Sequence, residues 1–183
     1  MTASVPTLTT GRLLLRPWRD DDLAPFAVLN ADPRVMEFFP AVLSRAESDA
    51  RAARIRLHME AHRFGLWAVE VSGGAPFIGF VGLQTASPSL PFAPAVEVGW
   101  RLAREHWGCG YATEAARAAV EFGFGVLGLE EIVSFTAARN RPSRAVMERL
   151  GMTHSPADVF EHPLIPPGHV LRRHVLYRLA AGA

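Results

Sequence analysis

The most constraining feature is a strand, a loop and a helix that follow one another in the middle of the chain. The run AVEVGWRLA (95–103) alternates like a strand, and EHWGCGYATEA (105–115) leads into helix-forming residues that continue to about Leu127. Amides in a first helical turn lack intrahelical partners, and the helix dipole adds positive charge there. Gly108 and Gly110 would let the backbone approach an anion closely. The pattern predicts a phosphate-binding turn, but an ordinary turn before a helix has the same spacing.

The rest of the chain predicts one mixed α/β domain over residues 1–183. Strand patterns occupy 12–18, 66–72, 76–86, 95–103, 130–138, 157–161 and 173–179. Helical patterns occupy 20–30, 32–40, 44–63, the segment up to 127, and 141–151. The longest of the early helices begins with a capping box, in which Ser44 precedes Glu47 by three residues.

Composition narrows the function classes. The net charge is +1 with acidic and basic residues interspersed, so the chain lacks the basic surface of a nucleic-acid-binding protein. All nineteen basic residues are arginine, which removes lysine as a base or Schiff-base former. No apolar run is long enough to cross a membrane, and the first residues do not resemble a signal peptide. With one cysteine, these features predict a cytoplasmic protein without disulfides.

Three motifs carry a resemblance to a known family. EVGWRLA (97–103), EHWGCGYATEA (105–115) and NRPSRAVMERLGM (140–152) resemble the GNAT superfamily of acyl-CoA-dependent N-acyltransferases. The residues of these motifs are most similar to those of the branch of ribosomal-protein N-terminal acetyltransferases, RimJ and RimL. The resemblance implies the GNAT fold, a twisted mixed sheet of about seven strands flanked by about four helices and splayed between the fourth and fifth strands.

The resemblance also implies acetyl-CoA as cosubstrate and no metal. In this family the glycine loop binds the coenzyme pyrophosphate, and pantetheine runs along the fourth strand like an added strand. The residues implied in coenzyme binding are Trp100, Arg101, Leu102, Glu105, His106, Trp107, Gly108, Cys109, Gly110, Tyr111, Ala112, Thr113, Asn140 and Ser143. Glu105 departs from the glutamine or arginine that the family motif carries at this position.

Two residues are candidates for proton transfer. Glu97 lies in an apolar strand, where a carboxylate must be paired, near solvent or functional. Some members of the family carry the general base there, and a structural hydrogen bond is the alternative. Ser143 is the candidate acid, and helix capping or coenzyme contact are its other roles. Met147 stands where many relatives have a tyrosine acid.

The cysteine and the histidines raise three further possibilities: a nucleophilic thiol, a metal site and a substrate pocket. Cys109 lacks a His–Asp pair to activate it as a nucleophile, and only its backbone is needed in the loop. His58 and His62 share a helical face, but no third metal ligand is signalled. In the tail, His162, His169 and His174 are candidates to line a substrate pocket.

The predicted reaction is direct transfer of acetyl from acetyl-CoA to a primary amine. The amine belongs to a protein N-terminus or a small molecule, and the loop HPLIPPGH (162–169) with Phe38 and Phe39 would form the acceptor walls. The alternatives are a non-catalytic acyl-CoA-binding module and an antibiotic- or polyamine-type acetyltransferase. The near-neutral charge argues against polyamines. A monomer and a homodimer both fit the sequence.

Overall fold

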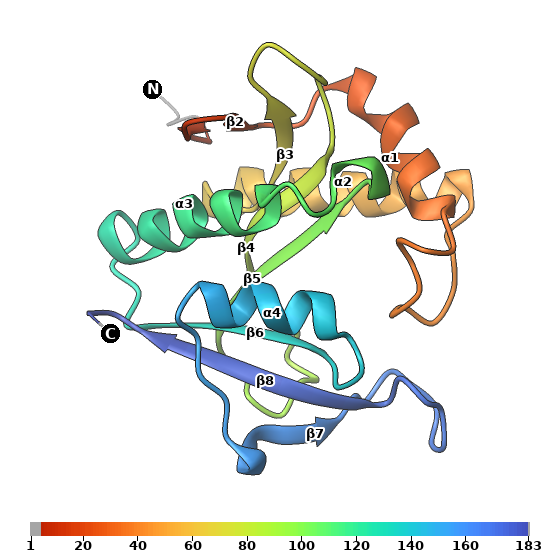
Figure 1. Ribbon diagram of the computed structural model, residues 1–183, viewed down its shortest axis with the longest axis vertical. Coiled ribbons are helices and arrows are strands. Elements are labelled where there is room, and N and C mark those ends of the chain that lie inside the picture. The colour runs from red at the N-terminus through yellow and green to blue at the C-terminus, as the bar shows by residue number, and fades with distance from the viewer. Residues whose placement is uncertain (1–4, 183) are drawn as a thin grey trace.

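The computed structural model describes residues 5–182, which form one eight-stranded sheet flanked by helices (Figure 1). The strands are β1 (Leu8–Thr9), β2 (Leu13–Arg16), β3 (Leu66–Val71), β4 (Gly79–Thr85), β5 (Val96–Leu102), β6 (Glu131–Ala137), β7 (Val159–Glu161) and β8 (Arg173–Ala180). Their order is β1-β2-β3-β4-β5-β6-β8-β7, and among these pairs β5 and β6 are the parallel one. The predicted mixed α/β fold is confirmed, with β1 as a strand that the sequence did not reveal.

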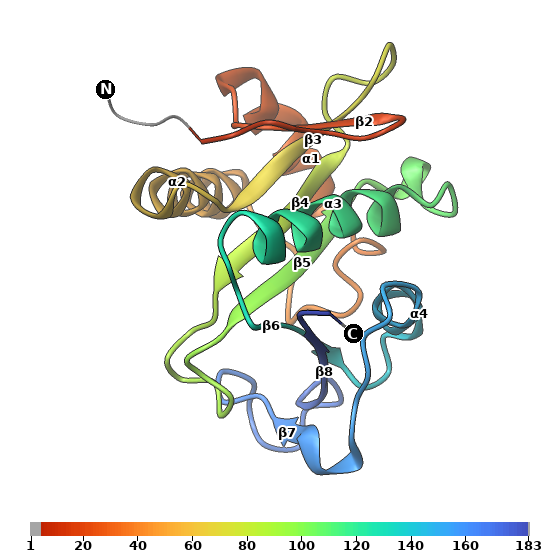
Figure 2. The ribbon, with the colours of Figure 1, turned by 90° about the vertical axis from the view of Figure 1, so that its left-hand side faces the viewer.

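Four α-helices cover the two faces of the sheet (Figure 2). They are α1 (Leu23–Ala31), α2 (Arg45–His62), α3 (Tyr111–Gly125) and α4 (Arg141–Arg149). The α3 helix packs on one face of β4 and β5. On the same face, Trp67 of β3 meets Phe122 of α3 edge to face with ring centroids 5.5 Å apart. The α1 and α2 helices lie on the other face, where Phe80 contacts Phe26 of α1 and Arg51 of α2. No helix among residues 5–182 has both the length and the apolar character to span a bilayer.

The capping box predicted for α2 is present. Ser44 accepts a hydrogen bond from the Glu47 amide, and the Glu47 carboxylate accepts one from the Ser44 amide at 2.8 Å. This pairing satisfies two amides of the first turn and fixes where α2 begins.

The helix predicted for residues 32–40 is wrong. These residues form successive turns, and the helix before them ends at Asp32, whose φ of −76° and ψ of 116° are extended. Pro33 explains the ending, because the ring of a proline disfavours helical geometry in the residue before it. Val35 and Met36 are nevertheless buried, so the turns are anchored to the core beside the sheet.

The sheet is nearly split between β5 and β6, which are the predicted fourth and fifth strands. Their register contains one Cα pair, Glu97 with Val133, and the Ser134 hydroxyl adds a hydrogen bond of 2.9 Å to the Val98 carbonyl. By contrast, β4 and β5 pair along seven positions. The part of β5 after Val98 therefore has a backbone edge that does not pair with β6, as the predicted splay requires.

Candidate active site

A cleft of about 1670 Å³ opens where β5 and β6 diverge. Its walls come from β5, the first turns of α3 and α4, the turns at 34–40, and the β7–β8 loop. Of the residues implied in coenzyme binding, those that line the cleft are Trp100, Arg101, Leu102, His106, Trp107, Gly108, Gly110, Tyr111, Ala112, Thr113, Asn140 and Ser143. Glu105 and Cys109 are exposed and are not among the lining residues.

The glycine loop has the backbone that the sequence predicts for a close approach. Gly108 and Gly110 have φ angles of 74° and 81°, which L side chains rarely adopt, and Gly110 is the N-cap of α3. The residues of the first turn of α3, Tyr111 to Thr113, line the cleft next to Gly108 and Gly110, which carry no side chains. This arrangement fits a phosphate group.

Arg12 holds this loop in place, a role that no local sequence pattern indicates. Its guanidinium donates to the Cys109 carbonyl at 3.0 Å, forms a 2.6 Å ion pair with Glu114, and lies 4.7 Å from the centre of the Tyr111 ring. Residues far apart in sequence are thus joined at the start of α3. Only the tertiary fold brings β2 beside this loop.

The first turn of α4 is capped by Asn140 and not by Ser143. The Asn140 side chain is buried and accepts a hydrogen bond of 3.2 Å from the Ser143 amide. Capping therefore does not occupy the Ser143 hydroxyl, which lies on the cleft wall. Met147 also lines the cleft and is 1 % exposed, so no acid stands where relatives have tyrosine.

Glu97 is a buried carboxyl at the junction of the two diverging strands. It is 8 % exposed, accepts a hydrogen bond from Gln84 across the β4–β5 pair, and faces the charge of Arg51. Desolvation raises the pKa of Glu97 to about 7, although Gln84 and Arg51 both favour the ionised form. A carboxyl with this pKa can accept a proton at neutral pH.

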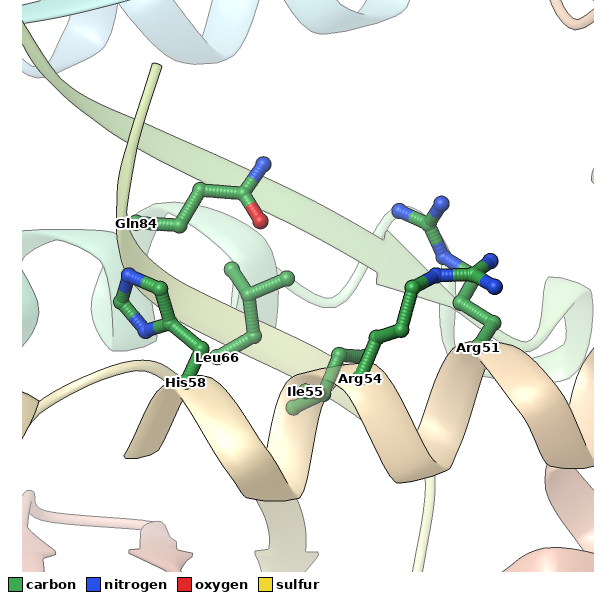
Figure 3. Close-up of a pocket in the computed structure, with 6 residues that line it drawn as sticks. All are labelled: Arg51, Arg54, Ile55, His58, Leu66 and Gln84. Atoms are coloured by element: carbon green, nitrogen blue, oxygen red, sulfur yellow. The ribbon is translucent and has the colours of Figure 1, made fainter. Parts of the chain in front are cut away.

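Gln84 and Arg51 also border a smaller cavity of about 250 Å³ between α2 and β4 (Figure 3). In Figure 3 the Gln84 amide and the Arg51 guanidinium extend from β4 and α2 toward the same space. Both residues line the large cleft as well, so the two cavities adjoin beside Glu97.

The histidines and the cysteine take different positions. His162 and His174 line the cleft with ring centroids 4.8 Å apart, and desolvation is the main cause that lowers the pKa of His174 to about 4. His169 is exposed outside the lining, so the prediction that it borders the pocket is wrong. The thiol of Cys109 points back to the Trp107 carbonyl at 3.6 Å.

The rings of His58 and His62 of α2 have centroids 4.3 Å apart, and Phe64, just after α2, meets the His58 ring edge to face at 5.5 Å. The Nε2 atom of His58 accepts a hydrogen bond of 3.3 Å from the Thr85 amide. Across residues 5–182, no three His, Cys, Asp or Glu side chains gather in a group that could hold a metal ion. The geometry of this pair therefore fits packing between α2 and β4.

The predicted acceptor walls meet at the end of the cleft. Phe38 packs against a small buried cluster that contains Ile165 and Leu171 of the β7–β8 loop. Phe39 covers the guanidinium of Arg101 at 4.0 Å from the ring centre. Both phenylalanines line the cleft, so this end of it, where we expect the acceptor, has an apolar surface.

Comparison with known proteins decides the family. A model of the acetyltransferase (GNAT) domain matches residues 12–153. The chain belongs to the GNAT acetyltransferase family. It is 31% identical over 172 residues to the FsC-acetyl coenzyme A-N(2)-transacetylase of Aspergillus fumigatus, covering 89% of this chain and 72% of that protein.

Solved structures agree with this assignment. This GNAT protein superposes on an acetyltransferase from Agrobacterium tumefaciens with a TM-score of 0.78 and 29% identity, covering 98% of this chain and 96% of that one. The RimJ protein of Mycobacterium smegmatis, solved with CoA-disulfide, gives a TM-score of 0.74 at 19% identity, covering 98% and 88%. The predicted GNAT fold is confirmed, whereas the RimJ likeness supports the fold alone.

Proposed function

We propose that this GNAT protein transfers an acetyl group from acetyl-CoA to a primary amine within a ternary complex. The observation that carries the proposal is that the glycine loop, the first turn of α4 and Glu97 all face one cleft. The relative from Aspergillus fumigatus supports the donor, since its name specifies acetyl coenzyme A. A buried carboxyl in the cleft lining, Glu97, whose pKa desolvation raises to about 7, supports an enzyme over a purely binding module.

The residues present fit the coenzyme. The amides from Gly108 to Ala112 would bind the pyrophosphate at the start of α3, where a branched side chain at Gly110 would not be tolerated. Cationic side chains that line the cleft and would balance the phosphates are Arg117, Arg139, Arg141 and Arg149. The backbone of residues 100–102 would bind pantetheine along the edge of β5 that β6 leaves free.

Glu97 would act as the general base, directly or through one water. It takes a proton from the ammonium form of the acceptor, and the neutral nitrogen then attacks the thioester carbonyl carbon. As the amide bond forms, the nitrogen releases its second proton to solvent and the C–S bond breaks. The hydroxyl of Ser143 would donate a hydrogen bond to the leaving sulfur, which takes up a proton to become the thiol. The products are the N-acetylated amine and the free thiol.

Acetyl-CoA is expected to raise the midpoint of thermal unfolding, because a ligand that binds the folded state alone stabilises it by mass action. The measurement is a thermal melt with and without millimolar acetyl-CoA, followed by assay of thiol release with a panel of amines. An unchanged melting temperature would overturn coenzyme binding. A shift without thiol release from any amine would favour the non-catalytic module.

Ser143→Ala is expected to lower the transfer rate by ~10-fold and to weaken acetyl-CoA binding slightly, since one hydrogen bond to a charged or polar group is lost. Thiol release and a coenzyme titration measure the two effects separately. Ser155→Ala is a suitable control, because this serine caps the 3-10 turn at Pro156–Asp158 and is not among the cleft residues. Parent-like kinetics in Ser143→Ala would remove the serine from the mechanism.

A further inference from the structure

We infer that the acceptor amine carries a carboxylate, which binds the buried guanidinium of Arg101 beside Glu97. The inference rests on the proposed acetyl transfer and specifies the class of acceptor. It selects a small zwitterionic amine over a protein N-terminus or a polyamine.

Arg101 is a buried cation that forms no ion pair with an acidic side chain among residues 5–182. It is 5 % exposed, and its Nη1 donates to the Asn30 amide oxygen at 2.6 Å. The Nε of Arg101 is buried with no hydrogen-bond acceptor among residues 5–182. An unpaired buried charge is costly, which indicates a site that an anion completes.

In the part of the chain that the structure describes, the other deeply buried arginine, Arg16, is fully paired, which makes Arg101 unusual. Arg16 is 3 % exposed, and it forms ion pairs of 2.8 Å with both Asp22 and Glu70. Arg16 therefore needs nothing from outside the protein. Arg101 lies on the wall of the cleft instead, where a ligand can reach it.

Arg51 is a second cation whose charge is only partly balanced by acidic groups. The Nε of Arg51 is buried without a partner in the described chain, and desolvation lowers the pKa of Arg51. Desolvation, followed by the charge of Arg51, lowers the pKa of Arg101 to about 9, so the group stays cationic at neutral pH. Glu97 is the acid that offsets Arg51, and it is itself partly protonated near pH 7. The acceptor end of the cleft thus carries excess positive charge.

The space between Arg101 and Glu97 is open. Both side chains lie on one face of β5 with Gly99 between them, and a Cβ built on Gly99 would meet nothing within 4 Å. Their Cα atoms are four strand positions apart, ~13 Å, and apart from Gly99 and its two chain neighbours no atom of the protein lies within 4 Å of the Cβ position between them. An acceptor lying over Gly99 can place its amine at Glu97 and its carboxylate at Arg101. The Phe39 ring over the guanidinium shields that contact from water.

The same charges disfavour the other acceptors. A polyamine would bring further positive charge toward Arg51 and Arg101, which costs free energy at close range. A protein N-terminus has a neutral peptide bond where the proposed acceptor has its carboxylate. Neither would neutralise the buried charge of Arg101.

The test compares amino acids with their carboxamides, which keep the amine and lose the anionic charge. The probes are glycine, alanine, and ω-amino acids from β-alanine to 6-aminohexanoate, each beside its carboxamide, together with an alanine-initiated peptide. We expect the parent to favour at least one carboxylate over its carboxamide by ~10-fold or more in kcat/KM, the effect of a hydrogen bond to a charged group. The chain length preferred in the series reports the distance between base and guanidinium.

Arg101→Gln should reduce that preference by ~10-fold or more, to near unity, whereas Arg45→Gln, at an exposed ion-paired residue of α2, should leave it unchanged. Differences in amine pKa between the two probes cancel when the ratio in the variant is divided by the ratio in the parent. Arg101→Lys retains the charge and should keep part of the preference. If Arg101→Gln does not fold, Arg101→Lys takes its place as the test of whether the preference for carboxylates depends on the guanidinium.

The inference is overturned if carboxylates and carboxamides react equally well, if the peptide is preferred, or if the ratio survives Arg101→Gln. It is also overturned if no carboxylate probe is acetylated although acetyl-CoA raises the melting temperature. A melting temperature that acetyl-CoA leaves unchanged would instead refute the proposed function.

Discussion

Replacing Glu97 with glutamine is expected to lower the rate of acetyl transfer by ~10²–10⁴-fold while leaving acetyl-CoA affinity close to that of the parent. Glutamine keeps the size of the side chain and can still pair with Gln84, but it cannot accept a proton from the amine. Steady-state thiol release measures the rate, and a coenzyme titration measures the affinity. Glu60→Gln, an exposed residue of α2, is the control and should behave like the parent.

The pH profile separates a base from a structural carboxyl. Because burial raises the pKa of Glu97 to about 7, kcat/KM of the parent should increase through pH 7 as the group ionises. This ascending limb should be absent in Glu97→Gln. Full activity with an unchanged profile would assign the proton transfer to water or to a histidine of the cleft.

Folding stability gives an independent check on the same group. A pKa raised in the folded state means that the native protein binds the proton of Glu97 more tightly than the unfolded chain does. This contribution is fully present below pH 4.5 and is lost as pH increases through about 7. Thermal melts should therefore show Glu97→Gln gaining stability relative to the parent between pH 5 and 8.

Gly110→Val is expected to lower acetyl-CoA affinity by ~10²-fold or more, which leaves binding below detection at ordinary concentrations. The φ of Gly110 is 81°, a conformation that a β-branched residue resists, and a Cβ there would approach Nη2 of Arg12 at 3.4 Å. The first turn of α3 would have to move, and its amides would no longer converge on a phosphate. Calorimetric titration with acetyl-CoA measures the loss.

Two control variants isolate this effect. Gly128 also has a positive φ, 67°, with open space around its missing Cβ, and it is not among the cleft residues. Gly128→Val therefore carries similar backbone strain and should keep coenzyme affinity. Cys109→Ser should bind and turn over almost normally, because its thiol faces the Trp107 carbonyl. A dead serine variant beside a working Gly110→Val would establish a thiol site instead.

Local sequence patterns predicted the strand, loop and helix around Gly110 because each depends on near neighbours. Period-two alternation in β5, glycines with positive φ and the capping box of α2 are all properties of a few consecutive residues. The helix expected at 32–40 failed for a local reason too, since the effect of Pro33 on Asp32 outweighed the apolar pattern.

Contacts between distant segments could not be read from such patterns. Arg12 reaches Cys109, and Arg101 reaches Asn30, only because β2 and α1 fold back onto the middle of the chain. Without an expected partner, an arginine in a strand looks like any solvated charge. Glu97 could be singled out because a lone acid in an apolar strand is conspicuous, but its pKa near 7 depends on burial that only the fold shows.

The short pairing between β5 and β6 also affects how firmly the two parts of the sheet are coupled. Backbone pairing of one residue couples a five-stranded leaf to a three-stranded leaf, and the packing of α3 against α4 adds a second link. In the proposed complex, pantetheine would form hydrogen bonds in the gap where β5 and β6 do not pair. The substrate would then contribute to the contacts that hold the two parts of the sheet together. We therefore expect coenzyme binding to hold the two parts of the sheet more firmly together and to raise the cooperativity of unfolding.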